Sequence, residues 1–429
     1  MRRRHFVQGC CAAIAAMSGA RLQNLVFANT APGEGRDILI NVFLRGGIDA
    51  LNFVVPFNDP DYVLARPRLK LSGNQVAQLD ASQISDIGIE LGLHPAAAPL
   101  RTLMNQNHLA IVAASGSTSG SRSHFEQQDF MDRGKPDDPH VEGGWLGRYL
   151  QAISASDIFA GVSKSTSVAA SLEGFTGALA LPSASGFSLN AHWNHRDDMR
   201  RALRLMYQAD ADLGAVARRT LEATDFIDYA NPGSYTPEFG AVYPSGSFGG
   251  SLSALAQLIK MDVGLKAATV DLGGWDTHES QANSDAATGT FNDLVAQLST
   301  GLAEFWKDMT NFHGRLTVVV MSEFGRRLRE NDNRGTDHGH GGVMMVLSAN
   351  VARGRIYGTW PGLQREQLFE SVDLQVTTDF RRVLSEVVIA RLRLNAPSIV
   401  FPDYNYQGPV GIFGDAGLPT TPANGMLVR

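Results

Sequence analysis

Five runs of apolar residues along the chain have the pattern of buried strands. Each run is continuous, rich in β-branched residues and bounded by glycine or other small residues, with no alternation of apolar and polar positions. Continuous runs of this kind are typical of strands that are covered on both faces, as in a parallel sheet. The predicted strands are residues 37–47, 108–116, 266–274, 316–325 and 342–349.

Helical patterns lie between these strands. From Phe291 to Phe312, apolar residues recur at spacings of three and four, and Thr290 with Asp293 is predicted to form an N-cap pair. Because strands alternate with helices, we expect an α/β fold with a mostly parallel central sheet and helices on both faces. Similar periodicity predicts further helices over residues 197–222, 251–263 and 379–393.

Two stretches interrupt this alternation. Residues 182–196 and 229–250 are rich in Gly, Pro, Ser and Tyr, and they predict long surface loops that could cover a cleft. The sequence has no repeat of the length seen in solenoids, no long run of charge and no linker that requires a second domain. We therefore expect residues 37–429 to form a single domain.

The N-terminus is typical of an export signal. A basic start precedes a weakly apolar stretch over residues 9–20, which is about half as long as a bilayer requires. The segment RRHFV at residues 3–7 resembles a twin-arginine signal, which a receptor of the export machinery reads as an address. We predict a signal over residues 1–28, a periplasmic or extracellular location and no stable membrane span. A basic amphipathic helix is the alternative interpretation.

Composition and charge narrow the chemistry. Of 429 residues, 44% are hydrophobic and 19% charged, which is ordinary for a globular protein. Cys10 and Cys11 both lie inside the predicted signal, so the mature chain has no thiolate for a disulfide or a metal site. Removal of residues 1–28 also removes four arginines and leaves 33 basic against 43 acidic residues, a net charge near −10. This balance argues against general nucleic-acid binding.

Metal-ligand side chains follow the predicted strands. In open α/β sheets, ligands bind outside the carboxyl ends of the strands. Asp276 and His278 follow one strand, and the glycine-rich segment RGTDHGHGGV holds three more such side chains just before the last strand. Imidazole and carboxylate ligands suit zinc, manganese or a similar divalent ion, although a hydrogen-bonded loop network is the alternative. The predicted ligands of one or two ions are Asp49, Asp276, His278, Glu323, Asp337, His338 and His340.

Some polar residues also have an ordinary structural explanation. Asp49, taken alone, could equally cap a turn. Ser123 stands before a predicted helix with Glu126 three residues later, which is the pattern of a capping box. His94, followed by a proline, is predicted to order a turn or a helix start.

Seven stretches, spread in order over most of the chain, resemble an exported bacterial family called domain of unknown function 1501. That family is grouped with the alkaline-phosphatase-like superfamily, whose members include phosphatases, sulfatases and metal-dependent phosphomutases. The resemblance implies an alkaline-phosphatase-like fold. The matching stretches are VFLRGGIDALNFVVP, LGLHPAAAPL, SRSHFEQQDFMDRG, GGWLGRYL, LGGWDTHE, MSEFGRRLRENDNRGTDHGHGG and TTDFRRVLSEVV.

The resemblance also implies roles for single residues. Asp49 matches the metal carboxylate after the first strand of the superfamily, and Asp276 with His278 resembles its later aspartate and histidine at a tighter spacing. Either histidine of the DHGHGG segment resembles the late histidine that precedes a glycine. The superfamily's next Asp-His pair is replaced by Glu323-Phe324 in this chain.

The superfamily nucleophile is matched by Ser123, and Arg45 or Arg122 could clamp the oxygens of an anion. The chain has no Cys-x-Pro-x-Arg segment, which excludes formylglycine chemistry. Together these residues predict an exported metal-dependent hydrolase or transferase. It would act on a phosphate or sulfate ester, either a small anionic ester or a decorated glycan, through a metal-activated serine or water. The alternative is a secreted binding or assembly protein that keeps a structural metal without turnover.

Overall fold

The structure is a computed structural model that describes residues 37–84, 87–182, 195–208, 211–230 and 235–414. The predicted signal over residues 1–28 lies outside the described residues, as does most of the predicted loop over 182–196. The predicted limits of the domain stay a prediction. The second predicted loop is shorter than expected, because helices occupy both of its ends.

Nine strands of the described residues form one central sheet, and all five predicted strands are among them. The order across the sheet is β13-β5-β12-β9-β1-β8-β6-β7, with β14 beside β5. The mixed α/β fold with a large, mostly parallel sheet is therefore confirmed. The strands are β1 (Ile38–Leu44), β5 (Leu109–Gly116), β6 (Gly161–Ser163), β7 (Ala178–Ala180), β8 (Ala267–Leu272), β9 (Leu316–Ser322), β12 (Gly342–Ser348), β13 (Ile356–Tyr357) and β14 (Thr378–Asp379).

One strand departs from the predicted direction. Within this sheet, β1 pairs in parallel with both β8 and β9, whereas β12 pairs antiparallel with β5 and β9. A parallel strand needs a crossover, usually a helix. The segment between β9 and β12 instead contains a two-stranded antiparallel ribbon, β10 (Arg326–Glu330) and β11 (Thr336–His338). As a result, β12 begins at the edge where β1, β5, β8 and β9 end.

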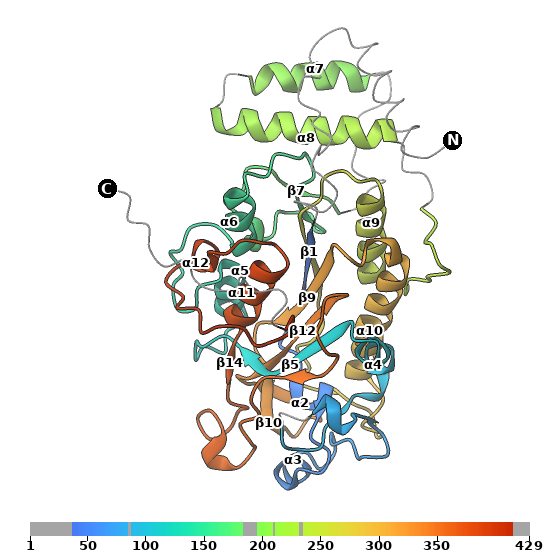
Figure 1. Cartoon of the computed structure of the whole chain (residues 1–429), viewed down its shortest axis with the longest axis vertical. Coiled ribbons are helices and arrows are strands. Elements are labelled where there is room, and N and C mark those ends of the chain that lie inside the picture. Colours follow the sequence, from blue (N-terminus) through green and yellow to red (C-terminus); the bar gives the residue numbers. More distant parts are fainter. Residues whose placement is uncertain (1–36, 85–86, 183–194, 209–210, 231–234, 415–429) are drawn as a thin grey trace. The chain divides into compact units, whose positions relative to one another are not determined.

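Helices cover both faces of the sheet (Figure 1). Alternate residues of β1 point to opposite faces, so Ile40 and Val42 pack in one layer while Leu39 and Phe43 pack in the other. The first layer holds α4 (Ala98–Asn105), α9 (Ser247–Lys260) and α10 (Thr290–Asp308). The second layer holds α5 (His124–Arg133), α6 (Trp145–Ala152), α11 (Phe380–Ala390) and α12 (Pro397–Val400).

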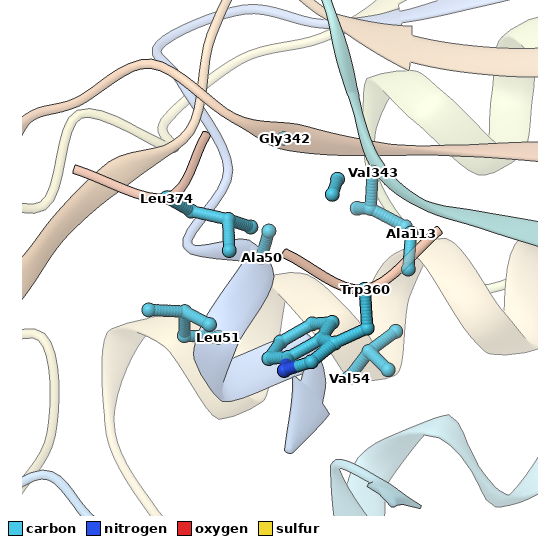
Figure 2. A pocket seen from close by; sticks show the side chains of 9 residues that line it. Ala50, Leu51, Val54, Ala113, Gly342, Val343, Trp360 and Leu374 are labelled. Atoms are coloured by element: carbon cyan, nitrogen blue, oxygen red, sulfur yellow. The ribbon is translucent and has the colours of Figure 1, made fainter. Parts of the chain in front are cut away.

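A small apolar pocket lies among α2 (Ala50–Phe53), β5 and β12 (Figure 2). Its volume is about 10 Å³, which is room for roughly one water molecule. The pocket is too small for a substrate. The labelled residues that line it are Ala50, Leu51, Val54, Ala113, Gly342, Val343, Trp360 and Leu374.

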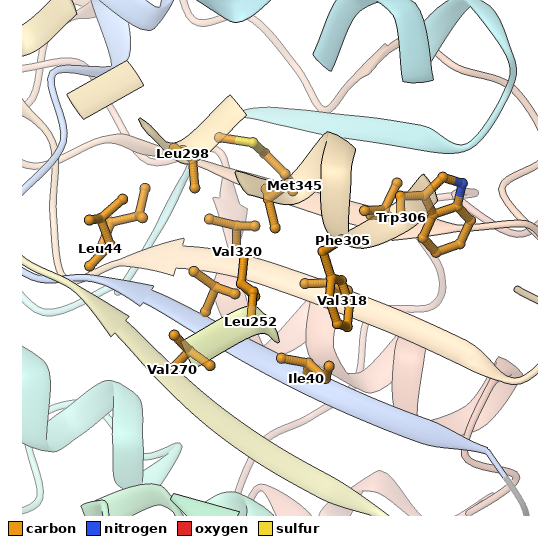
Figure 3. Packing of buried hydrophobic residues seen from close by; sticks show 14 of the residues in the cluster. Ile40, Leu44, Leu252, Val270, Leu298, Phe305, Trp306, Val318, Val320 and Met345 are labelled. Atoms are coloured by element: carbon orange, nitrogen blue, oxygen red, sulfur yellow. The ribbon is translucent and has the colours of Figure 1, made fainter. Parts of the chain in front are cut away.

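The core beneath α9 and α10 is built from neighbouring strands at matched positions (Figure 3). Val270 and Val320 flank Val42 in the parallel register, and all three side chains are buried. Leu298 and Phe305 of α10 also belong to this cluster and are fully buried. This packing fixes the strand ends from which the functional loops leave.

The helix predicted over 197–222 is two helices, α7 (Arg196–Met206) and α8 (Ala211–Ala230). An aspartate stands immediately before Ala211, and this residue type favours a helix start over a helix interior. None of the described helices has the length and apolar character of a segment that crosses a bilayer.

The remaining elements are short. His94 is the N-cap of a short 3₁₀ helix, and its Nδ1 accepts a hydrogen bond from the Ala96 N–H at 3.2 Å, so the predicted role of His94 is confirmed. The remaining short elements are β2 (Val54–Val55), α3 (Pro60–Ala65), β3 (Ala77–Gln78), η1 (Ala81–Gln83), β4 (Gly92–Leu93), η2 (Pro95–Ala97), η3 (Ala170–Leu172), η5 (Thr310–Phe312) and η6 (Arg365–Gln367).

Candidate metal centre

One helix start, one loop and one strand of the ribbon meet at the edge where the parallel strands end. His124 opens α5 after β5, and Asp276 and His278 follow β8. The β10–β11 ribbon carries His338 back toward the same edge, with His338 opposite Arg326 in the ribbon register. The antiparallel direction of β12 thus explains why a residue that precedes a strand joins residues that follow strands.

Three imidazoles and one carboxylate converge there. The Nε2 atom of His338 lies 2.9 Å from Nε2 of His278 and 3.1 Å from Oδ1 of Asp276. The Nε2 atom of His278 lies 3.0 Å from the same Asp276 oxygen. On the other side, Nε2 of His124 lies 3.4 Å from Oδ2 of Asp276. We refer to His124, Asp276, His278 and His338 as the histidine cluster.

The second nitrogen of each ring faces an oxygen atom. Nδ1 of His338 lies 2.8 Å from the carbonyl oxygen of Arg122, which can only accept a hydrogen bond. Nδ1 of His124 lies 2.8 Å from Glu323 Oε1, and Nδ1 of His278 lies 3.2 Å from Asp337 Oδ1. Each Nδ1 therefore carries the proton when the ring is neutral, and each Nε2 turns a lone pair toward the cluster. Metal-ligating histidines are oriented in this way.

The donor set fits a divalent cation. One atom each from His124, Asp276 and His338 can be chosen so that all three lie within 4.8 Å of one another. The Nε2 atom of His124 is buried and has no hydrogen-bond partner among the described residues. Two Nε2 lone pairs that face each other at 2.9 Å repel unless a proton or a cation lies between them. Nitrogen and carboxylate ligands without thiolate suit zinc or a similar ion.

Charges around the cluster support this reading. Partial burial of Asp276 opposes its ionisation, but the hydrogen bond and charge of Arg326 hold its pKa at about 2. Arg326 is fully buried and donates to Asp276 Oδ1 at 2.6 Å, and also to the carbonyl oxygens of Gly47 and Thr336. Burial lowers the pKa of His338, which favours the neutral form that binds metal.

The family follows from a comparison of sequences. The profile of the family described as "Protein of unknown function (DUF1501)" matches residues 36–397. The chain belongs to this family. No curated protein matches the chain at a significant level.

Solved structures with a similar fold bind metals. The zinc complex of the C-terminal periplasmic domain of EcEptC from Escherichia coli is 11% identical, covers 73% of this chain and 74% of that chain, and has a TM-score of 0.34. Two mutants of TAB5 alkaline phosphatase with magnesium bound are 12% and 11% identical, cover 72% of this chain and 90% of theirs, and have TM-scores of 0.25. These scores are too low to support a function, which must come from the site itself.

The site of this DUF1501 protein includes three of the seven predicted ligands, Asp276, His278 and His338. Glu323 and Asp337 lie one layer further out, where they hold the Nδ1 atoms of two histidines. Glu323 is fully buried, and although burial raises its pKa, hydrogen bonds from His124 and other donors outweigh this effect and lower it.

Two predicted ligands, Asp49 and His340, lie outside the histidine cluster. Asp49 is fully buried in a bidentate ion pair with Arg66, at 2.6 and 2.9 Å, and it also accepts a hydrogen bond from Gln281 at 2.5 Å. Both oxygens of Asp49 are therefore occupied by protein. His340 is buried against Phe369, with ring centroids 3.9 Å apart, and neither of its nitrogens has a hydrogen-bond partner in the described part of the chain.

Ser123 is the N-cap residue of α5, but its side chain makes no capping hydrogen bond. The expected capping box does not form, because Glu126 instead accepts a hydrogen bond from the Ser121 hydroxyl at 2.5 Å. The hydroxyl of Ser123 is thus placed directly before His124, at the positive end of a helix of 10 residues.

Neither predicted anion clamp is free. Arg45 pairs with Asp132 at 3.0 Å and with Asp271 at 3.2 Å. Arg122 pairs with Asp373 at 2.5 Å and with Glu370 at 2.8 Å, while its carbonyl oxygen accepts a hydrogen bond from His338 Nδ1. The side chains of Arg45 and Arg122 therefore already neutralise carboxylates.

The sequence interpretation missed two central residues. His124 stands in SRSHFEQQDF after the predicted strand 108–116, and a histidine just after a strand end was a usable signal. Arg326 gave no such signal, because one arginine among three in FGRRLRE is not distinguishable before the ribbon is known. Gly46, just after β1, packs closely against the loop that carries Asp276. A Cβ on Gly46 would lie 2.5 Å from the Asp276 nitrogen, so the loop requires glycine there.

Proposed function

We propose that this DUF1501 protein is an exported metal-dependent enzyme that hydrolyses or transfers a phosphate or sulfate ester at the histidine cluster. The observation that carries the proposal is the convergence of the three Nε2 atoms on Asp276, each ring being fixed by an oxygen behind it. The export assignment rests on the sequence of the N-terminus.

Exposure supports a catalytic rather than a closed structural metal. The side chains of Asp276 and His278 are 46% and 43% exposed, so the cluster opens to solvent on their side. Structural zinc sites are closed, whereas catalytic sites keep an open position. A divalent ion held there would lower the pKa of a coordinated water and polarise an ester oxygen.

The residues of the chain have separable tasks in this proposal. Glu323 and Asp337 orient His124 and His278, and Arg326 keeps Asp276 ionised. Ser123 is the candidate nucleophile, since its hydroxyl is not used as a cap and stands at the positive end of α5. Water is the other candidate.

A secreted binding or assembly protein with a metal but no turnover is the second candidate. Two observations favour it. Arg45 and Arg122 are both paired with carboxylates and cannot clamp an anion without leaving them. Phe324 also stands where the superfamily has a histidine.

The test is metal analysis combined with assays of aryl phosphate, aryl phosphodiester and aryl sulfate hydrolysis after loading with zinc, manganese or magnesium. We expect a bound ion and turnover of at least one ester, both lost in His124→Ala. His140→Ala is the matched control, because His140 is exposed and lies outside the cluster. Metal binding without turnover of any ester would favour the second candidate, and absence of bound metal would refute both.

A further inference from the structure

The carboxylate that orients His124 is itself held by several donors. Glu323 is fully buried. Its Oε1 accepts hydrogen bonds of 2.8 Å from His124 Nδ1, from the main-chain N–H of Gly46 and from the side-chain amide of Gln128. Its Oε2 lies 3.0 Å from the Ser322 hydroxyl. Because donors of this kind replace water around a buried carboxylate, they also decide where the histidine finds its acceptor.

Gln128 is the donor among these that depends most on its side chain. The N–H of Gly46 belongs to the main chain just after β1 and cannot turn away by side-chain rotation. The Ser322 hydroxyl has a single proton and a closer acceptor, the Leu44 carbonyl oxygen at 2.7 Å. Gln128 lies one turn after His124 on α5, so its amide reaches the carboxylate from the same helix face as the histidine. The position of the carboxylate therefore depends on this amide.

The amide of Gln128 supports the carboxylate in one orientation only. Turned the other way, its carbonyl oxygen would face Glu323, and two acceptors repel each other. Arg45 stands on the opposite side of the amide, with Nη1 3.5 Å from Gln128 Oε1. This distance is long for a hydrogen bond, but the positive charge still favours the oxygen on that side. The guanidinium is kept in place by Asp132 at 3.0 Å and Asp271 at 3.2 Å.

We infer that Gln128 is a positioning residue of the metal centre, which acts through Glu323 on the ring of His124. Arg45 keeps the amide of Gln128 in the required orientation, and it thereby has a role other than the anion clamp that the resemblance implied. The Nε2 atom of His124 has no hydrogen-bond partner in the described residues and lies 3.4 Å from Asp276, so a turn of the ring changes whether it reaches a shared ion. This inference rests on the metal site of the proposed function, but not on the reaction.

Metal affinity and the visible spectrum of bound cobalt test the role of Gln128. Gln128→Met keeps the length of the side chain and removes the amide donor. We expect zinc affinity, measured by competition with a chromogenic chelator, to fall about tenfold, as is typical when an outer partner of a metal ligand is lost. The absorption bands of bound Co²⁺ should also shift, because they follow the positions of the ligands. Asp129→Asn is the matched control, since Asp129 is the next residue of α5 and pairs with Arg133 instead of Glu323.

A pair of variants tests Arg45. Arg45→Lys keeps a positive charge beside the amide oxygen and should bind zinc as the wild type does, whereas Arg45→Gln removes the charge and should weaken binding in the direction of Gln128→Met. An equal loss in both Arg45 variants would overturn the part assigned to Arg45. Thermal unfolding shows whether each variant is folded, since Arg45 also neutralises the buried Asp132. If Arg45→Gln does not fold, the comparison of Gln128→Met with Asp129→Asn decides alone.

The outcomes separate this inference from the proposed function. Zinc binding that weakens in Gln128→Met but not in Asp129→Asn, without turnover of any ester, would uphold the positioning role and favour the second candidate function. Unchanged zinc affinity and an unchanged cobalt spectrum in a folded Gln128→Met variant would overturn the positioning role alone. An equal loss in Gln128→Met and Asp129→Asn would overturn it as well. Absence of bound metal in the wild type would overturn both the positioning role and the proposed function.

Discussion

Nε2 of His278 and Nε2 of His338 face each other at 2.9 Å, while the opposite nitrogens of the two rings face Asp337 and a main-chain carbonyl. Each ring is thus turned so that its Nε2 lone pair is available to a cation that Asp276 would also bind. The two rings come from segments 60 residues apart in the chain. Their alignment is a property of the assembled sheet edge and not of either loop.

The outer carboxylates should tune metal affinity without binding the ion. We expect Asp337→Ala to weaken metal binding about 10- to 100-fold, because His278 loses the acceptor that fixes its ring. Asp332→Ala removes an exposed acid from the same ribbon and should leave the affinity unchanged. Competition with a chromogenic chelator measures both. Equal affinities in the two variants would show that the carboxylate of Asp337 does not orient the site.

Asp49 should matter for stability rather than for metal. Asp49→Asn leaves the buried guanidinium of Arg66 without its charge partner, and a broken buried pair typically costs about 3–5 kcal/mol of unfolding free energy. Urea denaturation measures that cost. Metal content should stay at the wild-type value in Asp49→Asn and fall in Asp276→Asn. A folded Asp49→Asn variant that has lost its metal would instead make Asp49 a ligand, as the resemblance implied.

Arg326 should be the most sensitive basic residue of the site. Arg326→Leu leaves the Asp276 carboxylate and several buried carbonyl oxygens without a donor, so we expect a loss of about 1–3 kcal/mol for each buried oxygen left unpaired and a rise in the pKa of Asp276 from about 2. Arg327→Leu is the neighbouring control, because its side chain is 42% exposed. Chemical denaturation and NMR titration of the carboxyl group provide the readouts. A similar loss in both variants would count against a special role for Arg326.

His94 should make the fold sensitive to mild acid. Burial lowers the pKa of His94 to about 4 from an ordinary 6.5, so the unfolded chain binds a proton in this window that the folded chain does not. Its contribution to stability is present above pH 6.5 and declines as the pH falls to about 4, by at most about 3 kcal/mol.

His94→Asn isolates this effect, since asparagine can still accept a hydrogen bond from the Ala96 N–H. Between pH 7 and pH 4, the variant should lose less stability than the wild type in urea denaturation. Parallel pH profiles of the two proteins would mean that His94 titrates normally in the fold.

Much of the fold was predictable from the sequence because buried strands appear as continuous runs of apolar, β-branched residues. The five apolar runs are all strands of the central sheet, and the candidate cluster lies at the edge where four of them end. The direction of β12 was not predictable, since a run buried on both faces looks the same in either direction. The break between α7 and α8 was missed because the apolar periodicity of the two helices runs on.

The candidate site was predictable by residue type, but less so by role. Asp276, His278 and His338 meet as their clustering in sequence indicated, whereas Asp49 and His340 do not join them. A carboxylate after a strand can bind a metal, a histidine or an arginine, and only the side chain that faces it decides which. Asp49 faces Arg66 and forms an ion pair with it, whereas Glu323 faces His124 and orients its ring.

The position of β12 between β5 and β9 also bears on the stage of folding at which the site forms. Its two neighbours lie far apart in the chain, so β12 must insert between strands that have no other bridge at that point of the sheet. An ion would therefore bind late in folding, after β12 has paired with its neighbours. A truncated chain that ends before Gly342 should fail to retain the ion.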